Sequence, residues 1–322
     1  MVPEWIISMN SLGRNKIPFL FILDFDLKNP MVIPLNEINT EEILFQFPEA
    51  SNTPKQTALR KNIQINPNPL LYNDFLIKFN AVQDEIKAGN TYLLNLTFET
   101  PVNISSGLKE VFFCSQAKYK LLLKDRFVFF SPESFVKIHV GKITTFPMKG
   151  TLEKRNKNSL RELLNDPKEE AEHATITDLL RNDLGRVAGN IRVKRYRFMD
   201  EIRTGGKTIL QISSEIEGEI LPFYTENLGH LFEELLPAGS VTGAPKKKTV
   251  EIIRSVEGYN RGFYTGVCGI FDGKNLDSAV MIRFIENRNG NFYYKSGGGI
   301  TFMSNPEKEY QEIIQKIYVP VY

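Results

Sequence analysis

The chain has 322 residues, of which 42% are hydrophobic, 24% charged and 11% aromatic. This is an ordinary globular composition, and the length suits one large or two medium domains. With 40 basic and 38 acidic residues the formal net charge is +2, so no general excess of positive charge favours nucleic acid as a partner.

The chain start lacks a signal-peptide pattern, and the apolar run at 17–23 is too short to span a bilayer. We therefore expect no membrane association. Two cysteines, Cys114 and Cys268, indicate neither a disulfide framework nor a cysteine zinc site. The expected compartment is reducing, namely the cytoplasm.

In chain order, the elements begin with a strand-like apolar run at 19–25, followed by several Pro and Asn breakers that end in Asn-Pro-Asn-Pro at 66–69. We divide the chain into a short N-terminal section, 1–65, packed on a main domain, 66–322. Apolar residues at helical spacing predict a helix from Tyr72 to Ala88, which Gly89 ends. Strands are predicted next, at 92–99, 127–131, 134–140 and 142–146.

A second helix begins at Asp166 and Pro167 and runs to about Leu184. The final helix begins with Asn305 as N-cap and Pro306 as first helical residue. Between them we predict strands at 191–197, 208–218, 264–272, 278–287 and 291–297, and helices at about 225–236 and 245–257. Hairpin-like groups of strands with single helices between them favour a mixed, mainly antiparallel α+β domain over a doubly wound sheet.

Two glutamates of the second helix share its apolar face. At about 100° per residue, Glu169 and Glu172 lie within about 60° of Ile176 on a helical wheel. A charge directed at a core costs several kcal/mol unless it is paired, so these carboxylates require a cation. A structural salt bridge to Arg181 or Arg186 is the alternative.

The final helix has a similar acidic edge, where Glu309, Glu312 and Lys316 line up at i, i+3 and i+7. Hard oxygen ligands suit Mg²⁺ bound together with an anionic substrate. The four glutamates therefore predict a magnesium site. The alternative here is a solvated acidic face with a Glu312–Lys316 pair.

Three stretches are candidates for binding an anion. Gly297–Gly299 can adopt backbone angles closed to other residues, so that their N–H groups converge on an anion. The loop 237–246, PAGSVTGAPK, leads into a helix whose N-terminus could hold a carboxylate or phosphate, although it is not a P-loop. Its Lys246 is interpreted as part of a solvated helix start. Arg283, in the apolar strand AVMIRFI, should face a carboxylate of either the substrate or the protein.

Three residues are undistinguished by pattern alone. Lys149 in PMKGT lies after a strand and before a glycine, and a lysine becomes nucleophilic only where desolvation or neighbouring cations lower its pKa. From spacing it is a loop lysine. Glu133 lies in SPES between two strands, and Cys268 in GVCGI is interpreted as a small packed hydrophobe.

Seven motifs decide between these alternatives: PMKGT, the KEEAEH to DLLRNDLGRVA helix, PAGSVTGAPKKKTVEIIRSVE, RGFYTGVCGIF, AVMIRF, GGGIT and NPEKEYQEIIQK. They occur in the order seen in the chorismate-utilising enzymes, which the chain resembles from about residue 70 to its end. The resemblance implies one α+β catalytic domain, a four-layer arrangement of two antiparallel sheets sandwiched between helices, and a Mg²⁺-dependent reaction on chorismate.

Residue roles follow from the resemblance alone. Glu172 and Glu312 resemble the principal metal ligands, with Glu169 and Glu309 completing the site directly or through water. The implied substrate contacts are Tyr264 and Arg283 for the enolpyruvyl carboxylate, the amides of Gly297, Gly298 and Gly299 with Lys316 for the ring carboxylate, and Gly150, Thr151 and Thr242 near the ring.

The lysine of PMKGT distinguishes two branches of the family. The anthranilate branch typically has PIAGT, whereas the aminodeoxychorismate branch has PIKGT, which this chain resembles. By that resemblance Lys149 would attack C2 of chorismate, Glu133 would protonate the departing C4 hydroxyl, and ammonia would enter at C4. The expected product is 4-amino-4-deoxychorismate, a precursor of 4-aminobenzoate and folate, with no loss of pyruvate.

The chain departs from the pattern at two positions. Leu93 stands where amidotransferase relatives usually have Gln and isochorismate-forming relatives a water-activating Lys, which argues against water as nucleophile. Gln211 stands where many relatives have His. Neither cysteine sits in a glutaminase arrangement, so ammonia is expected from a separate glutamine amidotransferase subunit, and a separate pyridoxal-phosphate lyase should process the product.

Three rival functions stay open at this stage. The nearest is an anthranilate synthase component I. Another is a non-catalytic chorismate-binding or regulatory subunit, which Leu93 and Gln211 could support. A phosphoryl-transfer enzyme is the third.

Overall fold

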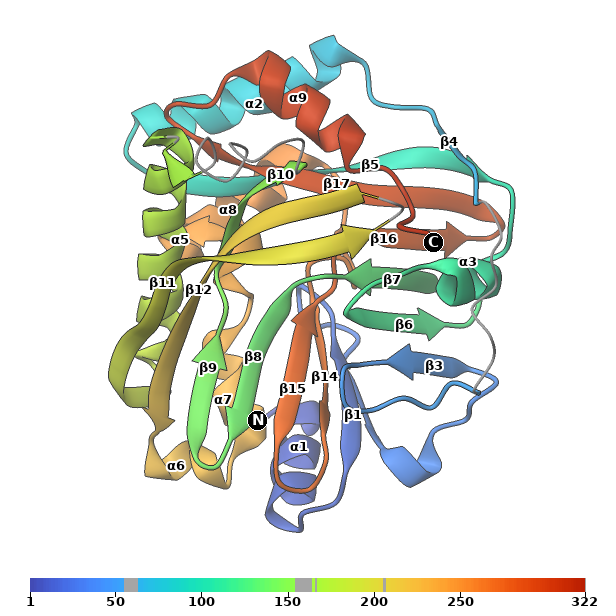
Figure 1. The fold of residues 1–322 in the computed structure, drawn as a ribbon, viewed down its shortest axis with the longest axis vertical. Helices are drawn as coiled ribbons and strands as arrows, with labels where there is room; N and C mark the ends of the chain where they lie inside the picture. The colour runs from blue at the N-terminus through green and yellow to red at the C-terminus, as the bar shows by residue number, and fades with distance from the viewer. Residues whose placement is uncertain (55–62, 154–163, 166, 205–206, 322) are drawn as a thin grey trace.

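The computed structural model describes residues 1–54, 63–153, 164–165, 167–204 and 207–321, without the side chains of 149–153, 167–168, 202–204 and 207–209. Within this part of the chain, every strand pair is antiparallel, and the strands form two sheets that run across one another (Figure 1). Helices pack on both sheets. The expected α+β class, with two antiparallel sheets and surrounding helices, is confirmed.

The first sheet has nine strands in the order β10-β12-β9-β8-β15-β14-β1-β2, with β11 paired to β12. Their bounds are β1 (Phe19–Leu23), β2 (Met31–Pro34), β8 (Ser134–His139), β9 (Lys142–Thr145), β10 (Met148–Glu153), β11 (Ala188–Thr204), β12 (Lys207–Ile220), β14 (Val267–Phe271) and β15 (Leu276–Val280).

The second sheet has eight strands in the order β13-β5-β17-β16-β7-β6-β3, with β4 paired to β5. Their bounds are β3 (Ile43–Gln46), β4 (Ile65–Pro67), β5 (Leu93–Ile104), β6 (Tyr119–Leu123), β7 (Phe127–Ser131), β13 (Gly243–Ala244), β16 (Phe284–Arg288) and β17 (Asn291–Thr301).

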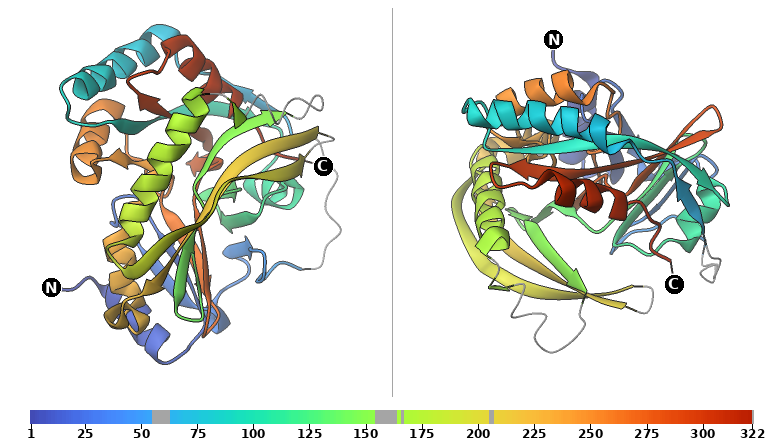
Figure 2. Two further views of the ribbon diagram at one scale, coloured as in Figure 1. Left: turned by 60° about the vertical axis from the view of Figure 1, so that its left-hand side comes forward. Right: turned by 90° about the horizontal axis from the view of Figure 1, so that it is seen from above.

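Helices α1, α5 and α7 pack on the first sheet, and α2, α3, α8 and α9 pack on the second. Helices α2 and α9 lie side by side over the β5–β17 pair (Figure 2), and Tyr310 of α9 packs against Tyr72 and Phe75 of α2. The described helices are α1 (Glu4–Arg14), α2 (Tyr72–Lys87), α3 (Leu108–Cys114), α5 (Pro167–Leu184), α6 (Pro222–Thr225), α7 (Leu228–Leu235), α8 (Lys246–Glu257) and α9 (Pro306–Gln315), with 3₁₀ turns η1 (Leu35–Glu37) and η2 (Gly239–Val241). None of them is long and apolar enough to cross a membrane.

Strand β1 shows why the core has layers. All five of its residues, FLFIL, are buried. Phe19, Phe21 and Leu23 pack against α1 and α7, while Leu20 and Ile22 pack in the cluster between the two sheets. Because strand side chains alternate between faces, a continuous apolar run is expected where both faces are covered.

The first 65 residues contribute to both sheets. β1 lies between β14 and β2 in the first sheet, and β3 pairs with β6 at the edge of the second. The helix at 72–88 and the strand at 127–131 are confirmed within one residue. Helices α1 and α3 were not predicted. The predicted helix at about 225–236 corresponds to α7, which the short α6 precedes.

The predicted single strand at 278–287 is wrong. The chain leaves the first sheet after β15, crosses at 281–283 and enters the second sheet as β16. A continuous apolar run does not reveal the crossing, since both strands are buried. A second crossing lies beside it, from β7 to β8 through residues 132–133. The Val280 amide donates to the Glu133 carbonyl (3.2 Å), and the Phe130 amide donates to the Arg283 carbonyl (3.1 Å).

A buried ion pair connects α8 to the backbone of η2 and β5. Arg261 and Glu257, each 1% exposed in the side chain, form an ion pair 2.5 Å long. The Arg261 guanidinium also donates to the Val241 carbonyl (2.8 Å) and the Asn95 carbonyl (2.6 Å). One cation therefore ties α8, η2 and β5 together.

Replacing Glu257 with Ala should lower the free energy of unfolding by about 3–5 kcal/mol, because it leaves the Arg261 charge buried without its carboxylate. Urea denaturation measures this. The control is Glu251→Ala on the same helix, whose pair with Lys248 is about half exposed and should contribute less than about 1 kcal/mol. Equal effects of the two substitutions would contradict the prediction.

Candidate functional site

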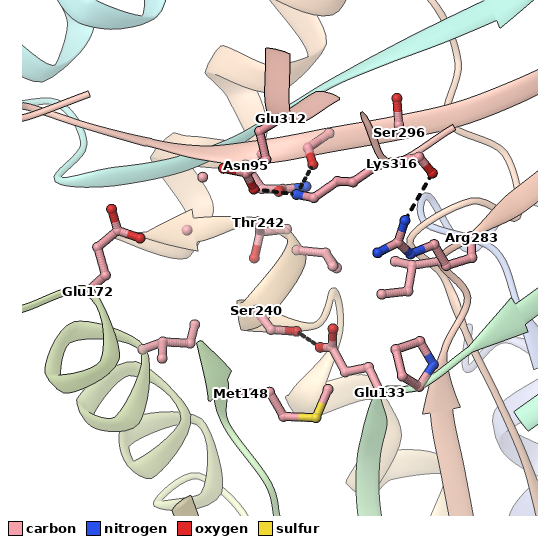
Figure 3. Close-up of a pocket in the computed structure, with 18 of the residues that line it drawn as sticks. Asn95, Glu133, Met148, Glu172, Ser240, Thr242, Arg283, Ser296, Glu312 and Lys316 are labelled. Carbon is pink, nitrogen blue, oxygen red and sulfur yellow. Dashed lines mark hydrogen bonds and ion pairs between the residues drawn. The ribbon is translucent and has the colours of Figure 1, made fainter. Parts of the chain in front are cut away.

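A cavity of about 520 Å³ opens beside the two crossings. Its walls come from β5 and β17, from helices α5 and α9, from η2 and from the crossing segments (Figure 3). The candidate site residues other than those at 149–151 all line it: Glu133, Glu169, Glu172, Thr242, Tyr264, Arg283, Gly297, Gly298, Gly299, Glu309, Glu312 and Lys316. Residues up to 183 positions apart in sequence thus share one space.

Arg283 occupies the crossing from β15 to β16, with a left-handed backbone at φ +54°. Its Nη1 donates to the Lys316 carbonyl at 2.9 Å, and its guanidinium carbon lies 4.7 Å from the centre of the Tyr318 ring. Among the described residues, no carboxylate forms an ion pair with Arg283. The alternative of a protein salt bridge therefore finds no support, and the guanidinium faces the cavity with N–H groups to donate.

The four glutamates approach the cavity from two helices. Glu169 and Glu172 on α5 are half-buried, and Glu309 on α9 is 3% exposed. Figure 3 shows Glu172 and Glu312 reaching the cavity from different sides. The arginines considered as alternative partners are engaged elsewhere: Arg181 pairs with Asp178, and Arg186 with Glu234.

The donor chemistry fits Mg²⁺, which prefers oxygen ligands and commonly takes one or two carboxylates, with water and substrate completing its octahedron. In the part of the chain that the structure describes, no three His, Cys, Asp or Glu side chains approach closely enough to hold a metal ion. Magnesium would therefore need substrate or water to complete its coordination.

The expected backbone conformation of the three glycines is wrong. Gly297–Gly299 continue β17 in register with Thr97, Leu96 and Asn95 of β5, and none has a positive φ. A Cβ atom at Gly297 would lie 2.6 Å from Thr97 Cγ2 and 2.7 Å from the Leu96 oxygen. The missing side chains allow close strand pairing and expose backbone to the cavity. Their contact with substrate stays a prediction.

Lys316 lies between the acidic helix and the glycine strand. Its Nζ is 2.7 Å from Glu312 Oε1 and donates to the Gly297 carbonyl at 2.8 Å. The i,i+4 pair considered as the alternative does form, with Glu312 half-exposed, yet both side chains line the cavity. The pair therefore does not exclude a role in binding.

Glu133 lies in the crossing from β7 to β8, where the Ser240 hydroxyl donates to its Oε1 at 2.5 Å. Thr242, fully buried, donates to the Ala238 carbonyl at 2.9 Å. Tyr264 is 3% exposed, and burial raises the pKa of its hydroxyl. The hydroxyl stays protonated and able to donate.

Lys149, Gly150 and Thr151 belong to β10, and their side chains lie outside the described part of the structure. The preceding residue, Met148, lines the cavity. The pairing of β10 with β12 shifts register between Met148 and Thr151.

Both departures from the family pattern also line the cavity. Leu93 is 8% exposed on β5, and Gln211 is 6% exposed on β12. The Gln211 amide lies 2.7 Å from the Met148 sulfur. These substitutions are thus inside the site.

Several lining residues were not predicted. They are Asn95, Pro132, Met148, Ile176, Ser240, Val241, Gly243, Ile282, Tyr294, Lys295, Ser296, Gly239 and Gln315. A signal existed for Gly239, Ser240, Val241 and Gly243, which lie in the PAGSVTGAPK loop with Thr242. The presence of the others in one cavity depends on the tertiary fold.

The interpretation of Lys246 as solvated is wrong. It pairs with Asp183 of α5 at 2.8 Å and donates to the Leu235 carbonyl at 2.9 Å. The side chains of Lys246 and Asp183 are only 16% and 14% exposed. Burial lowers the pKa of Lys246, and burial raises the pKa of Asp183. The pair holds α5, which carries two of the glutamates, against the start of α8.

Comparison with known proteins establishes the family. The family of chorismate binding enzymes matches residues 31–321. A relative from Haemophilus influenzae, "Uncharacterized PabA-like protein", is 44% identical over 99% of this chain and 97% of its own length. The chain therefore belongs to the chorismate binding enzymes, which act on chorismate.

Relatives with more specific names are more distant. "Anthranilate synthase component 1" of Acetivibrio thermocellus is 31% identical over 88% of this chain and 59% of the relative. "Aminodeoxychorismate synthase component 1" of Salmonella typhimurium is 28% identical over 89% and 65%. The fold matches a crystal structure described as a putative 2,3-dihydroxybenzoate-specific isochorismate synthase, DhbC from Bacillus anthracis, with a TM-score of 0.73, 22% identity and coverage of 98% and 87%.

Replacing Lys246 with Met should lower the free energy of unfolding at pH 7 by about 3 kcal/mol, because the Asp183 carboxylate loses its cation. Without that cation the folded-state pKa of Asp183 rises further above the unfolded value of about 3.9. The penalty is present above the folded pKa and disappears as the pH falls toward the unfolded value. Denaturant unfolding at pH 7 and pH 4.5 measures it.

The matched control is the double variant Asp183→Asn with Lys246→Met, which has no buried charge at this position. Its stability relative to the wild type should vary less between the two pH values. A deficit of Lys246→Met that stays constant or grows toward pH 4.5 would refute this account of the pair.

Proposed function

We propose that this chain converts chorismate and ammonia to 4-amino-4-deoxychorismate, with Lys149 as covalent nucleophile. The observation that carries the proposal is the single cavity that unites two acidic helices, an arginine without a carboxylate partner among the described residues, and the end of the strand that contains Lys149. This arrangement suits a small dianion. The choice of reaction rests on the lysine of PMKGT, because the site is otherwise common to both aminating branches.

The substrate would be held by its two carboxylates. Arg283 would receive the enolpyruvyl carboxylate, supported by the Tyr264 hydroxyl. Lys316 and the backbone of Gly297–Gly299 would receive the ring carboxylate. The two anchors lie on different elements, which would orient the ring between Glu133 and β10.

The reaction would proceed through two displacements. The Lys149 amine forms a bond to C2, the two conjugated ring double bonds shift, and the C4 hydroxyl leaves as water with a proton from the Glu133 carboxyl. Ammonia then bonds to C4, both double bonds shift back and the bond between C2 and Lys149 breaks. The net exchange is one ammonia for one water, so the product keeps its enolpyruvyl group.

Magnesium would be held by Glu172 and Glu312, with Glu169 and Glu309 acting directly or through water. When bound, the ion would neutralise the ring carboxylate among four glutamates. The residues of this chain would then orient the ion and the substrate against each other.

Ammonia would come from a separate glutamine amidotransferase subunit. Cys114 and Cys268 are both buried, and burial raises the pKa of the Cys268 thiol well above its usual range. Neither is a candidate for glutamine hydrolysis. A pyridoxal-phosphate lyase would then act on the product, and we assign the pathway to the cytoplasm.

The rival function is that of an anthranilate synthase component I. It is favoured by the relative of that name at 31% identity. It would place nitrogen at C2 and release pyruvate. The lysine of PMKGT favours amination at C4 instead, because the anthranilate branch typically has Ala at that position.

Incubating the protein with chorismate, ammonium and Mg²⁺ should yield 4-amino-4-deoxychorismate by liquid chromatography and mass spectrometry. The variant Lys149→Ala should abolish this product, because the first bond to C2 cannot form. The control Lys124→Ala changes a half-exposed surface lysine and should behave as the wild type. Anthranilate with pyruvate as the product would sink the proposal, and undiminished product from Lys149→Ala would remove the covalent step.

Removal of divalent metal with EDTA should abolish turnover, and added Mg²⁺ should restore it. Glu172→Gln should raise the Mg²⁺ concentration for half-maximal rate by about tenfold or more, because it removes one anionic ligand. Asp178→Asn, on the exposed side of the same helix, should leave that concentration unchanged. Full activity after metal removal would exclude the magnesium site.

A further inference from the structure

The segment after α9 is packed on the wall of the cavity behind Arg283. Val319 is 8% exposed in a core cluster with α3 and Tyr294. The Tyr294 hydroxyl donates to the Tyr318 carbonyl at 3.0 Å, and Val321 forms a β-bridge with Ser115. Tyr318 therefore has a fixed backbone position, although its side chain is 39% exposed.

The Tyr318 ring contacts Arg283 from outside the cavity. Arg283 lines the cavity and Tyr318 does not. The guanidinium carbon lies 4.7 Å from the ring centre, and Nη1 donates to the Lys316 carbonyl at 2.9 Å. Figure 3 shows the guanidinium beside the cavity with this bond on its upper side. The segment thus supplies both a ring and a carbonyl to one cation.

This support matters because Arg283 is held in an unusual conformation. A φ of +54° is uncommon for a bulky residue and costs free energy that the surrounding structure must offset. A guanidinium has five N–H groups in a planar fork, and a ring that faces the plane fixes its orientation without occupying the fork. The Lys316 carbonyl and the Tyr294 hydroxyl accept from this fork, and its further N–H groups can donate to a ligand.

We propose that Tyr318 is a positioning residue for substrate binding. Its ring holds the plane of the Arg283 guanidinium so that the open edge of the fork meets a carboxylate of chorismate. The inference rests on the proposed function only in assigning that carboxylate to Arg283. It applies whether nitrogen enters at C4 or at C2, since both reactions begin from chorismate.

A second arginine–tyrosine pair provides the comparison. The Arg288 guanidinium carbon is also 4.7 Å from a tyrosine ring, that of Tyr293. However, the fork of Arg288 is taken by Glu99 (2.6 Å) and Glu286 (2.5 Å). Neither Arg288 nor Tyr293 lines the cavity. The two pairs share their ring distance, but of the carboxylates in the described part of the chain only Glu99 and Glu286 pair with one of these arginines, Arg288.

The test is steady-state kinetics on the full chain with chorismate, ammonium and Mg²⁺, following chorismate consumption. Tyr318→Leu should raise the KM for chorismate by about 3- to 30-fold and change kcat by less than about twofold. Tyr318→Phe keeps the ring and should retain the wild-type KM. Tyr293→Leu should also retain it.

Calorimetry of chorismate binding without ammonium gives an independent readout. Tyr318→Leu should raise the Kd for chorismate by the same factor as the KM. Unfolding curves establish that each variant is folded. A KM and Kd for Tyr318→Leu within twofold of the wild type would overturn the inference, as would an equal loss in Tyr293→Leu or failure of Tyr318→Phe to restore binding. A product other than 4-amino-4-deoxychorismate would overturn the proposed function and leave this result interpretable.

Discussion

The hydrogen bonds that join the two crossings are the constraint on which the site depends. The chain passes between the sheets at 132–133 and at 281–283. The Glu133 carbonyl of the first crossing accepts from the Val280 amide, and the Arg283 carbonyl of the second accepts from the Phe130 amide. A carboxylate, Glu133, comes from one crossing and a cation, Arg283, from the other. Residues at crossings leave the regular pleat, so their side chains can enter the space where the sheets diverge.

The positive charge of Arg283 and the negative charges of the glutamates lie on different walls of that space. The described partners of Arg283 are the Lys316 carbonyl, the Tyr294 hydroxyl and the Tyr318 ring. The glutamates come from α5 and α9 on other walls. Lys316, paired with Glu312, lies between these regions. A ligand with two carboxylates and an accompanying cation would complement both regions, and burial strengthens such interactions relative to water. This is the physical reason for favouring a metal-bound dianion over a neutral metabolite.

Local pattern predicted the elements that carry the acidic residues. The apolar spacing of α5 placed Glu169 and Glu172 on its inner face, and Asn305 caps α9 through the Lys308 amide as expected. The predicted backbone conformation of Gly297–Gly299 was wrong, because strand pairing with β5 sets it. The prediction that Lys246 is solvated was wrong because its partner, Asp183, is 63 positions away in sequence and only tertiary packing brings the two together.

The crossings were beyond local pattern for a related reason. The apolar stretch through Arg283 is buried in two different sheets, so hydrophobicity does not change where the chain changes sheet. Ser240 and Asn95 likewise line the cavity only because η2 and β5 meet there. The family resemblance supplied the grouping of site residues that periodicity could not, since it carries tertiary information in the order of the motifs.

The central claim is that one cavity holds chorismate by two carboxylates between the crossings and the acidic helices. A crystal structure of Lys149→Ala soaked with chorismate and Mg²⁺ tests it most directly. The account predicts one carboxylate on the Arg283 fork, the other beside Lys316 and Gly297–Gly299, and the ion between that carboxylate and the glutamates of α5 and α9. Chorismate bound with neither carboxylate on Arg283, or with the ion away from both helices, would contradict it.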